Sequence, residues 1–296
     1  MENSTNINWY PGHMLKTKKQ IIEDLKLVDI VIEILDARIP LSSRNPDIHR
    51  IINGKKEIVI LNKSDLADEN QNRRWIEKFK NDGIVAISTD SNSGKGTKEF
   101  LNEVEKVLEE EIKKASEKGR VKKSIRLKIV GIPNVGKSSF INRISNKKTA
   151  EVGNRPGVTK QKQWVRIANN IELLDTPGVL WPKFEDEEIA LKLSYVGSIK
   201  DEILDETNIA YNLLKFLFNN YKEKIFTRYE LNEYNIEESN DLYEQDEIYN
   251  LMRAIGKKRG AIISGGEIDD EKTARIILTD FRCGKLGRIT LEKIKG

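Results

Sequence analysis

Residues 131–139, "GIPNVGKSS", fit the pattern G-x-x-x-x-G-K-[ST] of a phosphate-binding loop. The loop stands between a predicted strand at 124–132 and a predicted helix from Lys137 to about Ser145, as this pattern requires. In such a loop, backbone N–H groups surround a phosphate, the lysine neutralises its oxygens and the serine hydroxyl ligates Mg²⁺. A glycine-rich turn with an incidental lysine would not explain the strand and the helix. We therefore predict a nucleotide site formed by Asn134, Val135, Gly136, Lys137, Ser138 and Ser139.

Two downstream motifs could complete a site for Mg²⁺ and a γ-phosphate. "DTPG" (175–178) follows a predicted strand; Asp175 would hold the metal through water, and the N–H of Gly178 would sense the γ-phosphate. "RPGVT" (155–159) offers the hydroxyl of Thr159, which would close on the metal when a triphosphate is bound. One threonine in a loop is a weak signal alone, but it stands between the phosphate loop and Asp175. We predict Ser138, Thr159 and Asp175 as the metal ligands.

A guanine-reading loop is indicated by "NKSD" (62–65), which ends a predicted strand at 57–62. Guanine presents two adjacent donors, and the carboxylate of Asp65 can accept both, whereas adenine would oppose one acceptor with another. Asn62 can bond the N7 side of the base and brace the phosphate loop, and the stem of Lys63 can cover the base face. Ser88 and Thr89, after the next predicted strand, would supply backbone N–H to the guanine O6. A lone NKSD is most often a turn; this combination is not.

The order of these motifs is unusual, because the base loops precede the phosphate loop. The same set occurs in Ras-like GTPases in a cyclically permuted order. The chain resembles the circularly permuted GTPases, specifically the RbgA (YlqF) family of bacterial ribosome-assembly GTPases. The resemblance covers almost the whole chain and is carried by "WYPGHM", "DARIP", "NKSD", "GIPNVGKSS", "PGVT", "DTPGVLWPKFED" and "FRCGKLGRITLE".

This resemblance implies a GTP hydrolase that acts in late assembly of the large (50S) ribosomal subunit, stimulated by that particle. The expected partners are GTP or GDP and the large-subunit precursor, with its rRNA and ribosomal proteins. Two alternatives are a signalling switch that binds protein effectors and an ATP-driven enzyme such as a kinase. NKSD argues against ATP, and the basic segments argue against a switch without RNA.

The catalytic group is not where many GTPases carry a glutamine, since Val179, Leu180 and Trp181 follow "DTPG". His13, in "NWYPGHM", has a suitable pKa range, and the resemblance supports it as the residue that positions water. Docking on RNA or capping a helix is the alternative for His13, and His49 is expected to be structural. Related GTPases with asparagine at the position of Asn134 can hold K⁺ against the phosphates, so we expect K⁺ stimulation.

The fold class predicted is α/β: a circularly permuted P-loop GTPase domain with a mostly parallel six-stranded sheet, plus a small all-helical C-terminal domain. We assign 1–28 to an N-terminal segment with a basic helix, 29–185 to the GTPase domain and 186–296 to a helical RNA-binding domain. A long helix and basic linker at 94–123 would join the two positions that are the chain ends of the unpermuted domain. The "DTPG" loop would then lead directly into the C-terminal domain, so the nucleotide could act on that domain as a lever.

Composition sets the remaining expectations for the 296 residues. The single cysteine, Cys283, excludes an internal disulfide and suits a cytoplasmic location. No apolar run is long enough to span a bilayer, so we expect no membrane partner, and a monomer in solution. The chain from Arg253 onward holds eleven Lys and Arg against six acids, with glycines among the cations. A solvated basic face is the plain alternative to phosphate contacts on rRNA, for which the candidates are Lys257, Lys258, Arg259, Arg282, Lys285 and Arg288.

Overall fold

The computed structural model describes residues 22–45, 52, 54–119, 124–145, 163–168, 170–175, 186–199, 205–232 and 246–294. The chain divides into two compact units. Of the described residues, those up to 175 and those at 290–294 belong to unit 1, and Asp186–Ile289 belongs to unit 2. Each unit is described below by itself.

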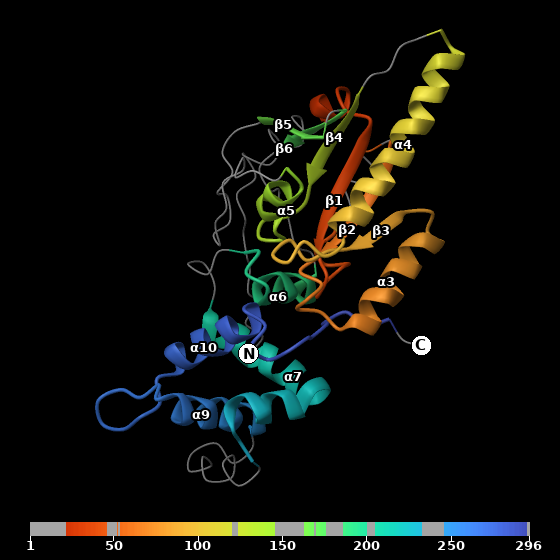
Figure 1. The fold of residues 1–296 in the computed structure, drawn as a ribbon. Coiled ribbons are helices and arrows are strands. Elements are labelled where there is room, and N and C mark those ends of the chain that lie inside the picture. The colour runs from red at the N-terminus through yellow and green to blue at the C-terminus, as the bar shows by residue number, and fades with distance from the viewer. Residues whose placement is uncertain are drawn as a thin grey trace. The chain divides into compact units, whose positions relative to one another are not determined.

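Unit 1 is built on one six-stranded sheet with the order β3-β2-β1-β4-β6-β5 (Figure 1). Its strands are parallel except for β5, which pairs antiparallel with β6. They are β1 Ile30–Asp36, β2 Lys56–Asn62, β3 Val85–Ser88, β4 Ile125–Val130, β5 Gln163–Ala168 and β6 Ile171–Asp175. The mostly parallel six-stranded sheet predicted from the sequence is confirmed.

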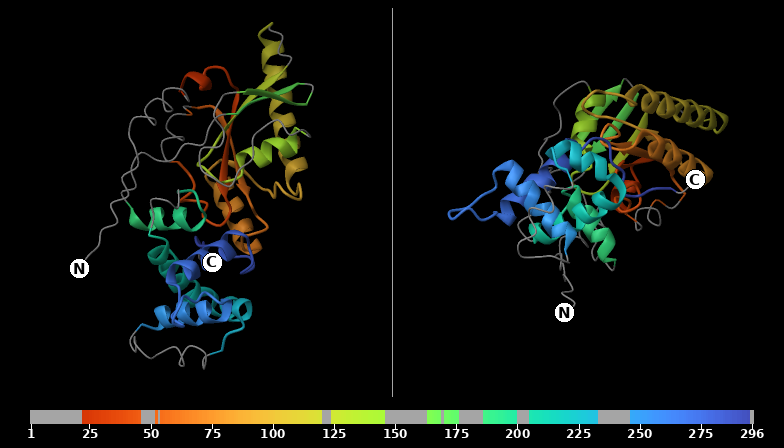
Figure 2. Two further views of the ribbon diagram at one scale, coloured as in Figure 1. Left: turned by 90° about the vertical axis from the view of Figure 1, so that its left-hand side faces the viewer. Right: turned by 90° about the horizontal axis from the view of Figure 1, so that it is seen from below.

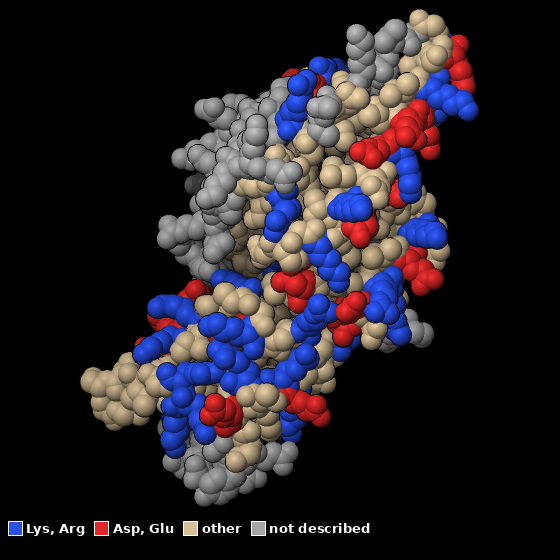
Figure 3. Space-filling view, viewed as in Figure 1, with Lys and Arg blue, Asp and Glu red and all other residues tan. Residues whose placement is uncertain are grey.

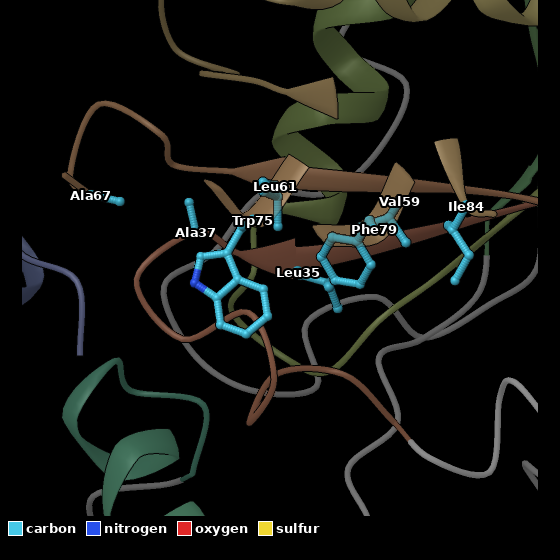
Figure 4. Packing of buried hydrophobic residues seen from close by; sticks show 8 residues of the cluster. All are labelled: Leu35, Ala37, Val59, Leu61, Ala67, Trp75, Phe79 and Ile84. Atoms are coloured by element: carbon cyan, nitrogen blue, oxygen red, sulfur yellow. The ribbon is translucent and has the colours of Figure 1, made fainter. Parts of the chain in front are cut away.

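The central strands are apolar because helices cover both faces of the sheet. All seven residues of β1 are buried, as is typical of a parallel strand covered on both sides. On one face, Trp75 and Phe79 of α3 (Glu69–Asn81) pack in a cluster with Leu35 of β1 and Val59 and Leu61 of β2 (Figure 4). The connection from β3 back to β4 runs the other way across the sheet, so a right-handed crossover puts α4 (Thr97–Glu117) on the opposite face. There Phe100 of α4 meets Phe140 of α5 (Lys137–Ile144) edge to face at 5.1 Å.

The strand order reverses between β1 and β4. From β1 the chain adds β2 and then β3 on one side, and it then crosses back to add β4 and β6 on the other. In open α/β sheets, ligands bind outside the carboxyl ends of the strands at such a reversal. The fold therefore points to the edge where Asp36, Asn62, Ser88 and Val130 end their strands.

Unit 2 is formed by helices α6 (Glu187–Tyr195), α7 (Glu206–Tyr229), α9 (Glu247–Arg259) and α10 (Asp270–Arg282). Helices α7, α9 and α10 contact one another (Figure 2). Outside the helices, an isolated bridge joins Ile262 to Ile268. The predicted helical C-terminal domain is confirmed. Its helix α7 bends at Tyr221 and continues beyond the bend, where Ile225 and Tyr229 are buried.

The predicted extent of the C-terminal domain, 186–296, is wrong at its end. Thr290 to Ile294 belong to unit 1, where they contact α3 and the turn after β1. Of the N-terminal segment 1–28, which is predicted to contain a basic helix, only the part from residue 22 is described, and residues 22–25 are helical. Within the described residues, no helix is both long enough and apolar enough to cross a membrane.

Candidate nucleotide site

The phosphate loop leaves β4 at Val130 and enters α5 at Lys137. Its backbone takes positive φ values at Gly131 (152°), Asn134 (63°) and Gly136 (92°). A Cβ atom on Gly131 would lie 2.5 Å from Ile34 O, and one on Gly136 would lie 2.3 Å from Asn62 Nδ2. Both glycines are therefore required by close packing as well as by conformation. The result is a tight loop that feeds the N-terminus of a helix, which is a favourable place for an anion.

Lys137 lies within this loop and is buried, with 7% of its surface exposed. Its Nζ donates a hydrogen bond to Ile132 O at 2.9 Å, so the ammonium is folded back over the loop. A buried lysine at the N-terminus of a helix is well placed to bind phosphate, because an ammonium group and an anion pair strongly where water is excluded. Val135 is buried, and Asn134, Ser138 and Ser139 are partly exposed along the same turn.

Asn62 ties the base loop to the phosphate loop, as expected for this residue. Its Nδ2 donates to Val135 O at 2.8 Å. Its Oδ1 accepts from Thr89 Oγ1 at 3.1 Å, Ser91 Oγ at 2.7 Å and Ser91 N at 3.3 Å. The side chain is 1% exposed. One buried amide thus holds three loops, each from a different strand, at one edge of the sheet.

The base loop is itself fixed on both sides. Lys63 adopts a left-handed conformation with φ of 58°, which turns the chain sharply after β2. Ser64 N donates to Thr89 O at 3.0 Å, and Asn72 Nδ2 of α3 donates to Ser64 O at 3.1 Å. Asp65 follows this turn and is partly exposed. The structure thus joins the loop of Lys63 and Asp65 to the phosphate loop through Asn62, although 131–138 lie about seventy residues further along the chain.

The second base loop, which follows β3 and includes Ser88 and Thr89, differs from the prediction in one respect. The N–H of Thr89, predicted to face the guanine O6, donates to Leu61 O at 2.9 Å and so continues the sheet. The neighbouring Asp90 N–H donates to Lys95 O at 3.0 Å. What Thr89 contributes instead is its hydroxyl, which bonds Asn62 together with Ser91. Ser91 was missed; its place just after the strand end was the only signal for it.

Asp36 and Arg38 are two further buried residues that the sequence reasoning left without a role, although "DARIP" was noted. Asp36 accepts from Arg38 Nε at 2.9 Å and Arg38 Nη2 at 2.7 Å. Lys63 Nζ lies 3.2 Å from Asp36 Oδ2. Although burial opposes it, Arg38 and Lys63 hold the pKa of Asp36 well below its usual range. Asp36 is therefore a carboxylate that anchors the lysine of the base loop, and its position at the end of β1 was the signal.

The metal ligands can be followed only in part. Ser138 lies in the first turn of α5, and Asp175 is the last residue of β6, the strand that pairs with β4. One carboxylate and hydroxyl oxygens are hard donors that suit Mg²⁺ once phosphate oxygens are added. The described residues contain no cluster of three His, Cys, Asp or Glu side chains that could hold a metal by itself. His13, His49, Thr159 and Gly178 lie outside the described residues.

The predicted rRNA-binding cations of unit 2 differ in their exposure and in their partners. Lys257, Lys258 and Arg259 are exposed at the end of α9, and Arg259 also donates to Arg228 O at 2.8 Å. On the face drawn in Figure 3, Lys and Arg side chains gather over unit 2. Lys285 pairs with Asp280 at 3.2 Å, and Arg288 is exposed.

Arg282, a predicted phosphate contact, also makes contacts within unit 2. Its Nη2 donates to Ser194 O at 2.8 Å and its Nε to Tyr195 O at 3.1 Å. The guanidinium thus caps the C-terminal end of α6, where carbonyl groups lack helical partners. Arg282 is a structural residue of unit 2 in the described conformation.

Comparisons with known proteins bear on this site. A family model described as a 50S ribosome-binding GTPase matches residues 126–246, beginning in the strand before the phosphate loop. Ribosome biogenesis GTPase A of Priestia megaterium is 46% identical, over 97% of this chain and 96% of its own length. The protein of the same name from Thermotoga maritima is 35% identical, over 97% and 94% respectively. Mitochondrial ribosome-associated GTPase 1 of Ictalurus punctatus is 34% identical, over 96% and 92%.

Two solved structures are similar over most of the chain. The GDP-bound structure of TM YlqF has a TM-score of 0.67 and 27% identity, and covers 93% of this chain and 98% of that one. The GNP-bound YlqF from T. maritima has a TM-score of 0.64 and 28% identity, with 94% and 98% covered.

Proposed function

From the premise that the chain belongs to the ribosome biogenesis GTPase A family, we propose that it acts in late assembly of the large ribosomal subunit and that the particle stimulates its GTP hydrolysis. The protein is a GTP hydrolase with a role in ribosome biogenesis. Its substrates are GTP and water, and its products are GDP and phosphate. This role would place it in the cytoplasm, as a monomer in solution.

The observation that carries the proposal is the junction made by Asn62. The loop that would read guanine and the loop that would bind phosphate come from different parts of the sequence, and they are joined through one buried amide. Asp65 would accept hydrogen bonds from the two adjacent donors of guanine, and Lys63 would cover the face of the base. Lys137 and the N–H groups of 134–138 would bind the β- and γ-phosphates, with Ser139 next to them.

Mg²⁺ would be held by Ser138, Asp175 and Thr159, and it would neutralise charge that develops on the phosphate oxygens. The positive φ of Asn134 turns this residue at the rim of the phosphate loop, where its side chain is the candidate ligand for K⁺. Gly178 would sense the γ-phosphate. Because residues 176–185 lead on to unit 2, the state of the nucleotide would be passed along the chain to the helical unit.

His13 would position the attacking water, because the residues after "DTPG" are Val179, Leu180 and Trp181, which cannot orient water by hydrogen bonding. Its delivery to the site would depend on the particle. This dependence would account for stimulation by the large subunit.

The exposed cations of unit 2 would contact phosphates of rRNA without reading base sequence. Lys257 and Lys258 are the most suitable, because they are exposed and form no ion pair among the described residues. Lys285 and Arg288 would add to them, while Arg282 would support the surface from within.

Binding to large-subunit precursors across a salt series tests this proposal. The double variant Lys257→Ala/Lys258→Ala should weaken binding and reduce the log–log salt slope by about 1 to 2 units. The control, Lys78→Ala/Lys80→Ala on α3, removes the same charge from an exposed part of unit 1. Equal slopes and affinities in the wild type and both variants would refute the rRNA contact.

A further inference from the structure

The last described residues of the chain, Thr290–Ile294, contact the rest of unit 1 at two places that flank the base loop (62–65). The first place is the turn after β1. Leu291 N donates to Arg38 O at 2.9 Å. The Glu292 carboxylate accepts from Leu41 N at 2.6 Å, from Ser42 N at 3.1 Å and from the Ser42 hydroxyl.

The second place is the N-terminal half of α3. Thr290 Oγ1 accepts from Asp68 N at 3.0 Å, only three residues after Asp65. Trp75 Nε1 donates to Glu292 O at 2.8 Å, and Ile294 N donates to Gln71 Oε1 at 2.8 Å. Thr290, Leu291 and Glu292 are all buried, at 0%, 5% and 8% exposure. The segment is therefore a fixed part of unit 1.

The turn after β1 connects this segment to the base loop. It is closed by Ile39 N to Asp36 O at 2.9 Å, Ser43 N to Ile39 O at 2.9 Å, and Asp36 N to Ser43 Oγ at 3.1 Å. Asp36 holds Arg38 on one side and Lys63 Nζ on the other. Glu292 satisfies two backbone donors at the far end of the same turn. Loss of these bonds would leave the buried N–H and hydroxyl of Ser42 without this acceptor, and the turn would have to move.

We propose that the C-terminal segment Thr290–Ile294 positions the base loop for guanine nucleotide. Glu292 holds the turn at 36–43, and Asp36 in this turn holds Lys63 of the base loop. Glu292 and Asp36 are positioning residues, and the inference rests on the proposed contact between Lys63 and the base. Nucleotide affinity thereby depends on a segment that is continuous in sequence with unit 2. By reciprocity, bound GDP strengthens the attachment of the segment to unit 1.

The test is a double-mutant cycle on GDP affinity, measured with a fluorescent GDP on the full chain. Glu292→Ala should raise the Kd for GDP about 10-fold, the effect of losing interactions worth one to two hydrogen bonds. In a Lys63→Ala background, the same change should have almost no further effect. Glu292→Gln, which keeps one carbonyl acceptor, should recover part of the affinity. Glu271→Ala, exposed on α10, is the control and should bind normally.

The outcomes separate the inference from the proposed site. If Lys63→Ala weakens GDP binding but Glu292→Ala does not, the inference fails and the site stands. If Glu292→Ala weakens binding equally in both backgrounds, its effect is general loss of structure and the inference also fails. If Lys63→Ala binds GDP normally, both fail.

Two further measurements protect the test from loss of folding. Ser42→Ala removes a single hydroxyl from the Glu292 contact, and it should raise the Kd for GDP about 2- to 3-fold at unchanged kcat. Hydrogen exchange at 290–294 should slow when GDP is added. The proposal is overturned if hydrogen exchange at 290–294 does not change with GDP and Ser42→Ala binds GDP as tightly as the wild type. This result does not depend on Glu292→Ala being folded.

Discussion

Replacement of Asn62 by alanine should weaken the contacts that join the loops of the nucleotide site. The variant should therefore unfold at a lower urea concentration than the wild type. The change removes four hydrogen bonds: one from Nδ2 to Val135 O, and three into Oδ1 from Thr89 and Ser91. A buried hydrogen bond contributes about 1 kcal/mol net, and unpaired partners cost more. Because the two hydroxyls can turn to other acceptors, we expect a loss of about 2–4 kcal/mol in the free energy of unfolding rather than a larger sum.

The assay is urea denaturation of unit 1 followed by tryptophan fluorescence, with and without GDP. Trp75 is buried in the cluster beneath α3, so its emission reports on this unit (Figure 4). Asn62→Asp keeps an acceptor for Thr89 and Ser91 but places a carboxylate oxygen against Val135 O. It should lose as much stability as Asn62→Ala, and more as the pH rises and the new group ionises.

The matched control is Asn70→Ala, an exposed asparagine in the first turn of α3 whose side chain should contribute less than about 0.5 kcal/mol. A loss below about 1 kcal/mol in Asn62→Ala, together with unchanged GDP affinity, would refute the role of Asn62 as the junction.

Three further predictions concern the base, the water and the pH dependence. Asp65→Asn should exchange guanine preference for xanthine in competition binding, and a variant that still prefers GTP would remove Asp65 as the base reader. His13→Ala should bind GTP and particles normally but lose about 10²–10⁴-fold in particle-stimulated turnover. Normal turnover would show that His13 has a structural role, and weakened particle binding would show that it docks on RNA. Burial raises the pKa of Glu33 to about 8, opposed by Arg44 and assisted by Glu57, both within the same cluster. Its stabilisation is present below pH 4.5 and is lost as the pH rises towards 8, by up to about 1.4 kcal/mol per pH unit, so Glu33→Gln should flatten this slope in urea titrations. An unchanged slope would contradict it.

Elements with local signals were predictable from the sequence. The α3 helix (Glu69–Asn81) shows such signals, because Asp68 caps its N-terminus and its apolar residues recur with helical spacing. The phosphate and base loops were found for a similar reason, since their chemistry requires a fixed order of residue types at the end of a strand.

Features built from distant contacts were not predictable. Glu292 meets Ser42 across 250 positions, and nothing in "ITLE" distinguishes a segment that returns to unit 1 from one that stays with unit 2. The glycines and cations around Arg282 suggested a phosphate contact, but they gave no sign that its guanidinium also binds carbonyl groups at the end of α6. In both cases tertiary hydrogen bonds decide the role.

The most direct test of the central claim is the rate of GTP hydrolysis with and without large ribosomal subunits. Purified protein with Mg²⁺ should hydrolyse GTP slowly alone and at least about ten times faster with immature or mature large subunits, and should leave ATP intact. The same reaction in K⁺ should be faster than in Na⁺. Stimulation that is absent with large subunits, or equal with small subunits, would contradict the account.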